Sequence, residues 1–374
     1  MPDNNSKIML NVSKKNFFYL LSLFFITFAK GLGLDSSSDI YKAVFYLTTL
    51  FILWNVLKER WTKDEYKKLF IISVLLVLNF LFGKDITSIF SFVYLIGTKY
   101  VDIKSILKTL FWARFISFVS LITANAFGFV ESRVILFYRN EQFVVRSDLG
   151  FGHPNLAQSS FALLVLLFCY LYRKKINIVT CSILALCNYF LYQQTLSRTS
   201  FYLVNLILLL FFFEKFFPNI IQKMIKYTKY IQPILLVLTV VLVKLLYLPF
   251  VQRLDILFTG RLAYSAIALN YGVSLFGHPF SAVSALFDNS YSMILYNSGL
   301  ILTILFMYAY YKTSESYIQK KDNATLILFI AISLLLFFES YYVNTLFNLL
   351  FFFIFKELVW KTRPSKIKIR FRFV

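Results

Sequence analysis

The sequence has few of the residues from which metal centres, disulfide frameworks and interdomain linkers are built. Its 374 residues include only 3 cysteines, 2 histidines, 11 glycines and 7 prolines. Cys169, Cys181 and Cys187 lie in apolar runs without metal-ligand spacing, so we expect them to be packing residues. With so few candidate ligands, we expect no metal and no cofactor. No Gly/Ser-rich or Pro-rich stretch divides the chain, which favours a single domain over residues 1–374.

Apolar residues, by contrast, are abundant. They make up 59% of the chain, the mean hydropathy is +0.69, and apolar runs recur from one end to the other. A run of about 18 or more apolar residues is typical of a transmembrane helix. The sequence therefore predicts an all-α polytopic membrane protein with about 12 transmembrane helices, near residues 16–33, 41–57, 68–83, 86–99, 105–129, 154–172, 176–194, 198–217, 231–250, 290–311, 324–339 and 345–357.

Acidic residues are also scarce, with 18 against 39 basic residues and a net charge of +21. A charge of this size can indicate nucleic-acid binding, but its distribution favours another explanation. If the N-terminus is cytoplasmic, the lysine-rich clusters fall repeatedly on the cytoplasmic side, as in most multi-pass membrane proteins. We therefore expect both termini to be cytoplasmic, contact with membrane lipid and no nucleic acid. Two large loops, at about 130–153 and 251–289, would then be extracytoplasmic.

The charged residues that break this asymmetry are arginines. Arginine offers a planar fork of donors that suits phosphate oxygens, whereas lysine is a point charge. An outer face enriched in arginine therefore indicates a phosphate or pyrophosphate ligand. The simpler alternative is that some of these side chains only pair with nearby acids such as Asp148 or Asp255. The six external arginines are Arg133, Arg139, Arg146, Arg198, Arg253 and Arg261.

Three expected helices enter the membrane from the outer side with polar residues at their starts. These starts are His153-Pro154-Asn155, Ser197-Arg198 and Asp288-Asn289-Ser290-Tyr291. Such residues often cap helices, and helix N-termini also attract anions. A further short helix is expected from Thr259, as its cap, to about Leu275, with Arg261 in its first turn.

Three titratable side chains on this face are candidates for acid–base work. His153 precedes a helix start, where it could donate to a phosphate or act as a base. Asp288 either caps its helix or accepts a proton, and Glu339 ends an apolar run at the outer edge. A carboxylate at a membrane boundary is costly unless it is paired or wetted.

In order along the chain, these motifs resemble a known family. Arg146 with Gly152-His153-Pro154-Asn155, then Arg198, Thr259-Gly260-Arg261-Leu262, Asp288-Asn289-Ser290-Tyr291 and Glu339 with Asn344 are similar to the Wzy-type polymerases of oligosaccharide repeat units, which are related to the O-antigen ligases. The resemblance covers residues of about 146–350. Each motif alone is short, and the N-terminal third carries none of them.

The resemblance implies a GT-C-like architecture and a metal-independent, inverting glycosyltransferase of the bacterial cytoplasmic membrane. Donor and acceptor would both be oligosaccharides linked to undecaprenyl pyrophosphate, and the active site would face outside. Arg146 and Arg261 would bind pyrophosphate, with Arg198 and His153 assisting and Asn155, Asn289 and Tyr291 in support. The related ligases carry a histidine where this chain has Asp288, so Asp288 or Glu339 would act as the base.

Other functions are also compatible with this pattern. A ligase would share the donor but transfer the glycan to another acceptor. A polysaccharide flippase or transporter would be expected to carry charges along several spans, whereas the expected spans here contain few, notably Arg114 and Lys244. A chain-length regulator and a flippase are expected as protein partners of a polymerase.

Overall fold

Helices occupy the apolar runs, and six of them are long and apolar enough to cross a bilayer. The computed structural model describes residues 14–35, 37–139, 142–282 and 287–360. The six are α2 (Asp39–Leu57), α3 (Lys63–Gly83), α5 (Ile103–Ala126), α6 (Pro154–Leu171), α8 (Arg198–Phe216) and the continuous stretch Ser290–Gln319, which comprises α13 (Ser290–Met293), a π turn (Ile294–Ser298) and α14 (Gly299–Gln319).

The remaining helices are shorter, less apolar or bent. Together α9 (Pro218–Ile225) and α10 (Thr228–Lys244) would make a seventh span, bent by 48° at the break between them. The chain is therefore a predominantly helical multi-pass membrane protein, and length and composition support six or seven of the twelve expected spans. The other helices are α1 (Lys14–Gly31), α4 (Ile86–Ile96), α7 (Ile178–Thr195), α11 (Pro249–Leu257), α12 (Arg261–Asn270), α15 (Asn323–Phe338) and α16 (Leu350–Ile354), with short 3-10 or π turns at Arg173–Lys175, Phe280–Ala282 and Phe355–Val359.

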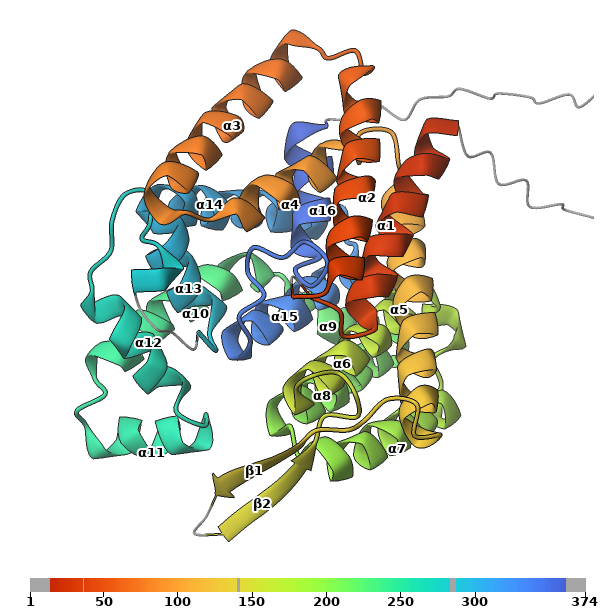
Figure 1. The fold of residues 1–374 in the computed structure, drawn as a ribbon, viewed down its shortest axis with the longest axis vertical. Helices are drawn as coiled ribbons and strands as arrows, with labels where there is room; N and C mark the ends of the chain where they lie inside the picture. The colour runs from red at the N-terminus through yellow and green to blue at the C-terminus, as the bar shows by residue number, and fades with distance from the viewer. Residues whose placement is uncertain (1–13, 36, 140–141, 283–286, 361–374) are drawn as a thin grey trace, which may run out of the picture.

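The fold is consistent with the expected all-α class, with one local departure in the first large loop, where β1 (Val134–Arg139) and β2 (Gln142–Ser147) form an antiparallel hairpin. Both segments are rich in β-branched and aromatic residues, which favour strands over helices. Val134, Leu136 and Val145 on one face are exposed, whereas Arg146 on the other is buried. Figure 1 shows the hairpin at the bottom of the molecule, far from the start of α1 at the top.

The centre of the molecule is formed by α6 and α15. The helix α6 packs against α5, α7, α8 and α15. Its small residues, among them Ala157, Ser159 and Ala162, are almost fully buried and allow the neighbouring helices to approach closely. In α15 the side chains of Leu328 and Ile332 are fully buried. These two helices hold their outer ends in fixed relative positions.

Residues 339–349, between α15 and α16, have no regular helix, so the helix expected at 345–357 begins only at Leu350. Irregular backbone within a membrane protein is tolerated where its polar groups find partners inside the protein. Ser91 Oγ donates to the Val343 carbonyl at 2.5 Å, Asn348 Nδ2 donates to the Tyr342 carbonyl at 2.8 Å, and the Arg114 guanidinium donates to the Leu346 carbonyl. Three side chains thus fix this segment in place.

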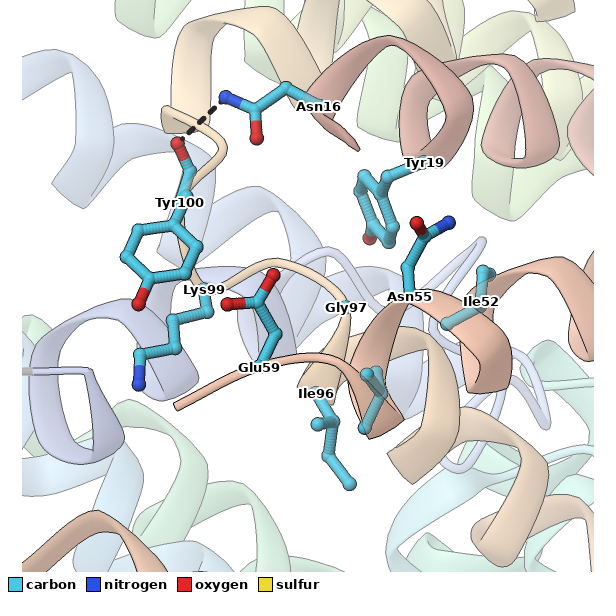
Figure 2. A pocket seen from close by; sticks show the side chains of 10 residues that line it. Asn16, Tyr19, Ile52, Asn55, Glu59, Ile96, Gly97, Lys99 and Tyr100 are labelled. Carbon is cyan, nitrogen blue, oxygen red and sulfur yellow. Dashed lines mark hydrogen bonds between the residues drawn. The ribbon is translucent and has the colours of Figure 1, made fainter. Parts of the chain in front are cut away.

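A cluster of side chains surrounds Lys99, which follows α4. It lies at the end of the molecule opposite the β1–β2 hairpin. Lys99 Nζ lies 2.7 Å from Glu65 Oε2 and 2.7 Å from the Arg60 carbonyl, and it lies 4.5 Å from the centre of the Trp61 ring. Figure 2 shows the small cavity beside Lys99, where Asn16 donates to the Tyr100 carbonyl at 3.1 Å. Its volume of about 20 Å³ is suited to a single water molecule. This inner cluster, defined by Arg60, Trp61, Glu65 and Lys99, is therefore closed and well paired.

Candidate functional site

Arg146 is positioned by the hairpin and by the first turn of α6. In the hairpin register Arg146 lies opposite Ile135, one residue before the end of β2. Its Nε donates to the Thr195 carbonyl at 2.8 Å, and one Nη donates to Asn155 Oδ1 at 2.7 Å. The residue is only 7% exposed. Asn155, expected in a supporting role, therefore orients a guanidinium group that the strand and two helices enclose.

His153 caps α6 with its imidazole ring. Its Nδ1 accepts a hydrogen bond from the Asn155 backbone N–H at 3.2 Å, and Pro154 occupies the first helical position. Partial burial and the nearby Arg146 charge lower the pKa of His153, so the ring is largely neutral at pH 7. A neutral ring that accepts at Nδ1 carries its proton at Nε2. In this tautomer His153 is arranged to donate from Nε2 to a ligand oxygen.

Arg261 begins α12 beside a backbone turn that the sequence did not indicate. Thr259 was expected to cap this helix, but it adopts a φ of +62° and its hydroxyl donates to the Phe258 carbonyl, so that expectation is wrong. The cap is Gly260, with a φ of +82° that suits glycine. Asp255 Oδ1 accepts from the Leu262 N–H at 2.7 Å and so fixes the first turn. The helix ends at Asn270, not near Leu275.

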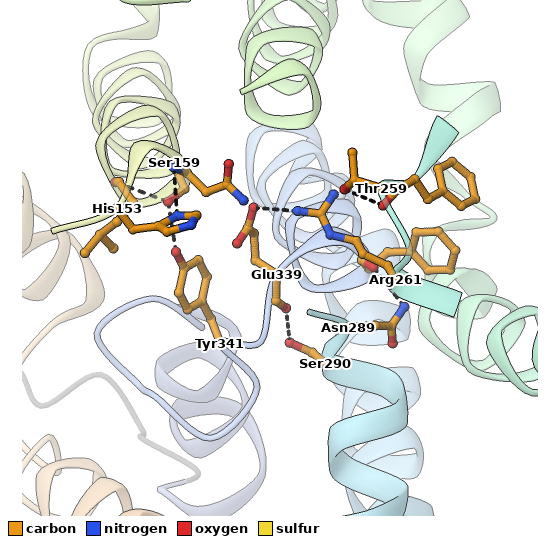
Figure 3. A network of polar contacts seen from close by, with 12 residues as sticks. His153, Ser159, Thr259, Arg261, Asn289, Ser290, Glu339 and Tyr341 are labelled. Carbon is orange, nitrogen blue, oxygen red and sulfur yellow. Dashed lines mark hydrogen bonds and ion pairs between the residues drawn. The ribbon is translucent and has the colours of Figure 1, made fainter. Parts of the chain in front are cut away.

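Arg261 and Glu339 form a buried ion pair. One Nη of Arg261 lies 3.4 Å from Glu339 Oε1, and the two residues are 4% and 6% exposed. Figure 3 shows Glu339 between the Arg261 side chain and a group comprising His153, Ser159 and Tyr341. The Nε of Arg261 is buried and makes no hydrogen bond to the described residues. The guanidinium group therefore keeps donor capacity that the fold does not use.

The carboxyl group of Glu339 is held in an environment that disfavours its charge. Burial raises the pKa of Glu339 to about 7, with a contribution from Asp288, while Arg261 and Arg146 oppose the shift. A carboxyl with this pKa is ionised in about half of the molecules at neutral pH. Its backbone carbonyl accepts from Ser290 Oγ, which ties it to the start of α13. Glu339 is therefore the described carboxyl best suited to exchange a proton near pH 7.

Asn289, and not Asp288, caps α13. Asn289 Oδ1 accepts from the Tyr291 and Ser292 backbone N–H groups at 2.8 and 3.0 Å, and its Nδ2 donates to the Phe337 carbonyl at 2.8 Å. The fully buried Tyr291 hydroxyl donates to the Ser333 carbonyl at 3.0 Å. Asn289 and Tyr291 thus hold α13 against α15. Asp288 is partly buried and makes no hydrogen bond or ion pair with the residues that the structure describes.

Arg198 lies at a separate apolar groove. One of its Nη atoms donates to the Leu257 carbonyl at 3.2 Å. Arg198 lines a groove of about 350 Å³ between α8, α11 and α15, whose other walls include Leu203, Leu206 and Phe338. The guanidinium carbon of Arg261 lies 6.0 Å from the centre of the Phe338 ring. Phe338 therefore separates the apolar groove from the Arg261–Glu339 pair.

Five of the candidate residues come together and form what we call the outer site: Arg146, His153, Arg261, Asp288 and Glu339. The charges of Arg146, Arg261 and Asp288 all act on both His153 and Glu339. Arg198 is at the neighbouring groove. The alternative was that the arginines expected outside pair with nearby acids such as Asp148 and Asp255. In the described structure these two carboxylates accept backbone N–H groups instead: Asp148 from residues 133 and 150, and Asp255 from residue 262. Among the ion pairs that the structure describes, Arg261–Glu339 is the one that involves an arginine.

Three neighbours of the outer site, Ser159, Tyr341 and Arg114, were not assigned to it from the sequence. Ser159 Oγ and the Tyr341 hydroxyl lie 3.0 Å apart and link α6 to the segment after α15. Arg114, in α5, lies 4.6 Å from the centre of the Phe347 ring and holds the same segment from the other side. The sequence marked Arg114 as a charge within a span, and this was the signal that could have identified it.

The described residues contain no group of three or more His, Cys, Asp or Glu side chains that could hold a metal ion. No protein-family model, no curated protein and no solved structure matches the chain.

Proposed function

We propose that this protein polymerises lipid-linked oligosaccharide repeat units on the outer face of the bacterial cytoplasmic membrane. The observation that carries the proposal is the outer site, where two buried guanidinium groups and a carboxyl of raised pKa lie next to an apolar groove. A lipid that carries a diphosphate needs cationic groups for its phosphate oxygens and, beside them, an apolar groove for its hydrocarbon tail. The order of the motifs, which resembles the Wzy-type polymerases, supports the same function.

In this proposal the two arginines bind the donor diphosphate. Arg146 is buried and oriented by Asn155, and Arg261 has an Nε donor without a partner among the described residues. The site therefore combines two guanidinium charges, the kind of group that binds phosphate oxygens best. The N–H groups at the starts of α6 and α13 are already bonded to His153 and Asn289. The arginine side chains, more than the helix N-termini, therefore supply the positive charge.

The chemistry is one displacement at the anomeric carbon of the donor. The acceptor hydroxyl oxygen attacks this carbon, the bond from the carbon to the diphosphate oxygen breaks, and its electron pair leaves with the diphosphate. The hydroxyl proton passes to the Glu339 carboxylate. Arg146 and Arg261 stabilise the negative charge that grows on the leaving oxygens. Glu339 is favoured over Asp288 as the base because burial brings its pKa to about 7.

The groove lined by Arg198 accommodates the polyprenyl tail. Its aliphatic and aromatic walls match a hydrocarbon chain, and Arg198 can contact the diphosphate at the boundary between polar and apolar surroundings. Undecaprenyl pyrophosphate is the carrier that this chemistry fits in bacteria. A flippase that delivers the repeat units and a regulator of chain length are the protein partners that follow from this function.

The test is turnover of a synthetic lipid-linked repeat by the purified protein in lipid nanodiscs, with products resolved as a ladder. We expect lipid-linked polymers to form, with and without a chelator, and to disappear in Arg146→Ala and Arg261→Ala. Arg253→Ala, in the same loop region but exposed, is the matched control and should polymerise normally. Transfer of the glycan to a lipid core instead would indicate a ligase, and transport without chain growth would indicate a flippase. Undiminished ladders from Arg261→Ala would contradict the assignment.

A further inference from the structure

A second cavity lies close to the outer site, on another side of residues 339–349. It has a volume of about 320 Å³ and is bounded by α1, α2, α4 and residues 344–346. Its size falls within the range of small-molecule sites. Glu339 belongs to the same irregular segment as Asn344, Thr345 and Leu346, so one short stretch of chain contributes to both the outer site and this cavity.

The wall of the cavity combines aromatic rings with polar groups, and its one charged residue, Lys42, is paired with Asp39 at 2.9 Å. Five of its thirteen lining residues are aromatic, among them Tyr41, Phe45 and Phe90, and Thr87, Asn344 and Thr345 are polar. Phe45 and Phe90 are arranged edge to face with ring centres 4.6 Å apart. A rigid aromatic wall with a few polar groups suits a ligand that has both apolar faces and hydroxyl groups.

Two of these polar groups have no partner among the residues that the structure describes. Thr345 is only 3% exposed, and its hydroxyl makes no hydrogen bond to the described residues, although the residue lines the cavity. Asn344 Oδ1 accepts from the Leu346 N–H at 3.0 Å, while its NH₂ group makes no hydrogen bond to the described residues. Buried polar groups are normally satisfied, so unpaired ones that line a cavity indicate a ligand or water.

The neighbouring cavity between α3, α4, α14 and α16 gives a contrast. It has a similar volume of about 340 Å³, but its walls are mostly aliphatic and aromatic, and two of its three serines, Ser88 and Ser91, are bonded to Asp85 and to the Val343 carbonyl. That cavity suits a hydrocarbon chain. The cavity beside Thr345 has the additional polar groups that a hydrocarbon would leave unsatisfied.

We propose that the cavity lined by Tyr41, Phe90, Asn344 and Thr345 binds the saccharide part of the substrate. Sugar rings present C–H faces that pack on the aromatic side chains, and their hydroxyl groups pair with the threonine and asparagine side chains. The identity of the saccharide rests on the proposed polymerase function, whereas the saccharide site itself does not. Residues 339–349 then connect the saccharide site to the base, Glu339.

The experiment uses the full chain in nanodiscs and the oligosaccharide repeat released by mild acid from the host's own lipid-linked pool. Binding is measured by calorimetry for the wild type and three variants. Thr345→Val removes one hydroxyl at nearly constant volume, and Thr87→Trp, at an exposed position on the rim, blocks the cavity. Leu47→Trp is the control, on an exposed face of α2 that does not line the cavity.

We expect affinity to fall about fivefold in Thr345→Val, the effect of one lost hydrogen bond of about 1 kcal/mol. In Thr87→Trp we expect a loss of at least about tenfold, equivalent to 1.4 kcal/mol or more, and no change in Leu47→Trp. The KM for the lipid-linked repeat should rise in the same order. Competition experiments with the free single repeat and with a free dimer of repeats show which saccharide the cavity binds. Stronger competition by the single repeat indicates the acceptor, and stronger competition by the dimer indicates the growing chain.

The outcomes separate this inference from the proposed function. Saturable binding that both cavity variants weaken, in a protein that forms no polymer, would support the saccharide site and contradict the polymerase. Normal polymerisation with unchanged affinity and KM in Thr345→Val and Thr87→Trp would overturn the saccharide site alone. Absence of saturable binding by the wild type up to about 10 mM, an affinity of less than about 3 kcal/mol, would also overturn it.

Discussion

The inner cluster and the outer site both bury positive charge, but they satisfy it differently. Lys99 has a carboxylate at 2.7 Å, a carbonyl at 2.7 Å and the face of Trp61 at 4.5 Å. Arg261 has a single carboxylate at 3.4 Å and a buried Nε without a described partner. The inner cluster uses the donors of Lys99 for the fold, whereas at the outer site the Nε of Arg261 has no partner among the described residues.

This difference separates a structural role from a binding role. Leaving a buried donor without a partner costs about 1–3 kcal/mol, so a ligand that supplies an acceptor to the Nε of Arg261 would recover this free energy on binding. Burial also brings the pKa of Glu339 to about 7. Perturbed carboxyls that lie beside unsatisfied cations are typical of functional sites. Mutations in the two regions should therefore have opposite consequences for stability and activity.

The largest effect is expected for Arg261→Ala. Removing a preorganised donor from a growing negative charge lowers kcat on the order of 10³-fold. The variant should remain folded in the membrane, because Glu339, whose pKa is already raised to about 7, can take up a proton when its partner is removed and so leaves no unpaired buried charge. Turnover of the lipid-linked repeat measures the loss, with Arg253→Ala as control. If Arg261→Ala polymerised at the wild-type rate, the binding role that distinguishes the outer site from the inner cluster would be contradicted.

Lys99→Met should show the reverse pattern. Removing one partner of a buried ion pair costs about 3–5 kcal/mol, so we expect a large drop in thermal stability in detergent. The activity of the remaining folded protein should be unchanged. Lys320→Met is the control, because Lys320 pairs with Glu357 while about half exposed, and such pairs contribute about 0–1 kcal/mol. Equal stabilities of the two variants would show that the inner cluster is not structural.

The pH dependence of turnover sharpens the assignment of the base. Glu339 must be ionised to accept a proton, and its pKa is raised to about 7. We therefore expect kcat/KM to fall about tenfold per pH unit well below pH 7 and to level off above it. This acidic limb of the pH profile should be absent from the residual activity of Glu339→Gln. A limb centred near pH 4, the ordinary value for a carboxyl, would point to a different base.

The same shift affects stability with a definite sign. A carboxyl whose pKa is higher in the folded protein than in the unfolded chain favours folding while it is protonated. This contribution is fully present below about pH 4 and is lost as the pH rises through about 7. Wild type and Glu339→Gln should therefore differ in the pH dependence of their melting temperatures over this interval. Parallel profiles would show that Glu339 has an ordinary pKa.

The smallest effect is expected for Asp288→Asn. Asn289 performs the capping, and Glu339 is proposed as the base, so loss of the Asp288 charge should change kcat by less than about threefold, against about 10²-fold or more for loss of a general base. Removing a negative charge near Glu339 should also shift the acid limb to lower pH, because Asp288 contributes to the raised pKa of Glu339. A loss of activity as large as that of Glu339→Gln would reverse the two assignments.

The sequence predicted where the helices lie better than it predicted how they begin and end. Helices occupy the apolar runs because hydrophobic length alone specifies them. The hairpin was not predicted, although residues 134–139 and 142–147 are rich in strand-favouring side chains, because two short segments do not form a stable hairpin by themselves and this one depends on the rest of the fold. The irregular segment 339–349 could not be foreseen, because Arg114, Ser91 and Asn348 stabilise it and their positions depend on the packed fold.

For the site, the residue types in the sequence indicated which side chains take part, but not which of them pair with one another. The surplus of arginine in the outer loops singled out Arg146 and Arg261, which the structure brings near Glu339 and His153. The Arg261–Glu339 pair joins residues far apart in the chain, so only the folded structure, which brings the first residue of α12 to the residue after α15, reveals it. Caps were ambiguous as well, because neighbouring polar residues such as Asp288 and Asn289 compete for the same position.

The most direct measurement is the binding of undecaprenyl pyrophosphate without any sugar to the purified protein, followed by native mass spectrometry in detergent. The account predicts saturable binding that inorganic pyrophosphate competes with, that Arg261→Ala and Arg146→Ala weaken strongly, and that Arg253→Ala leaves unchanged. Equal binding by all four proteins would contradict the claim that the outer arginines hold a diphosphate-linked lipid.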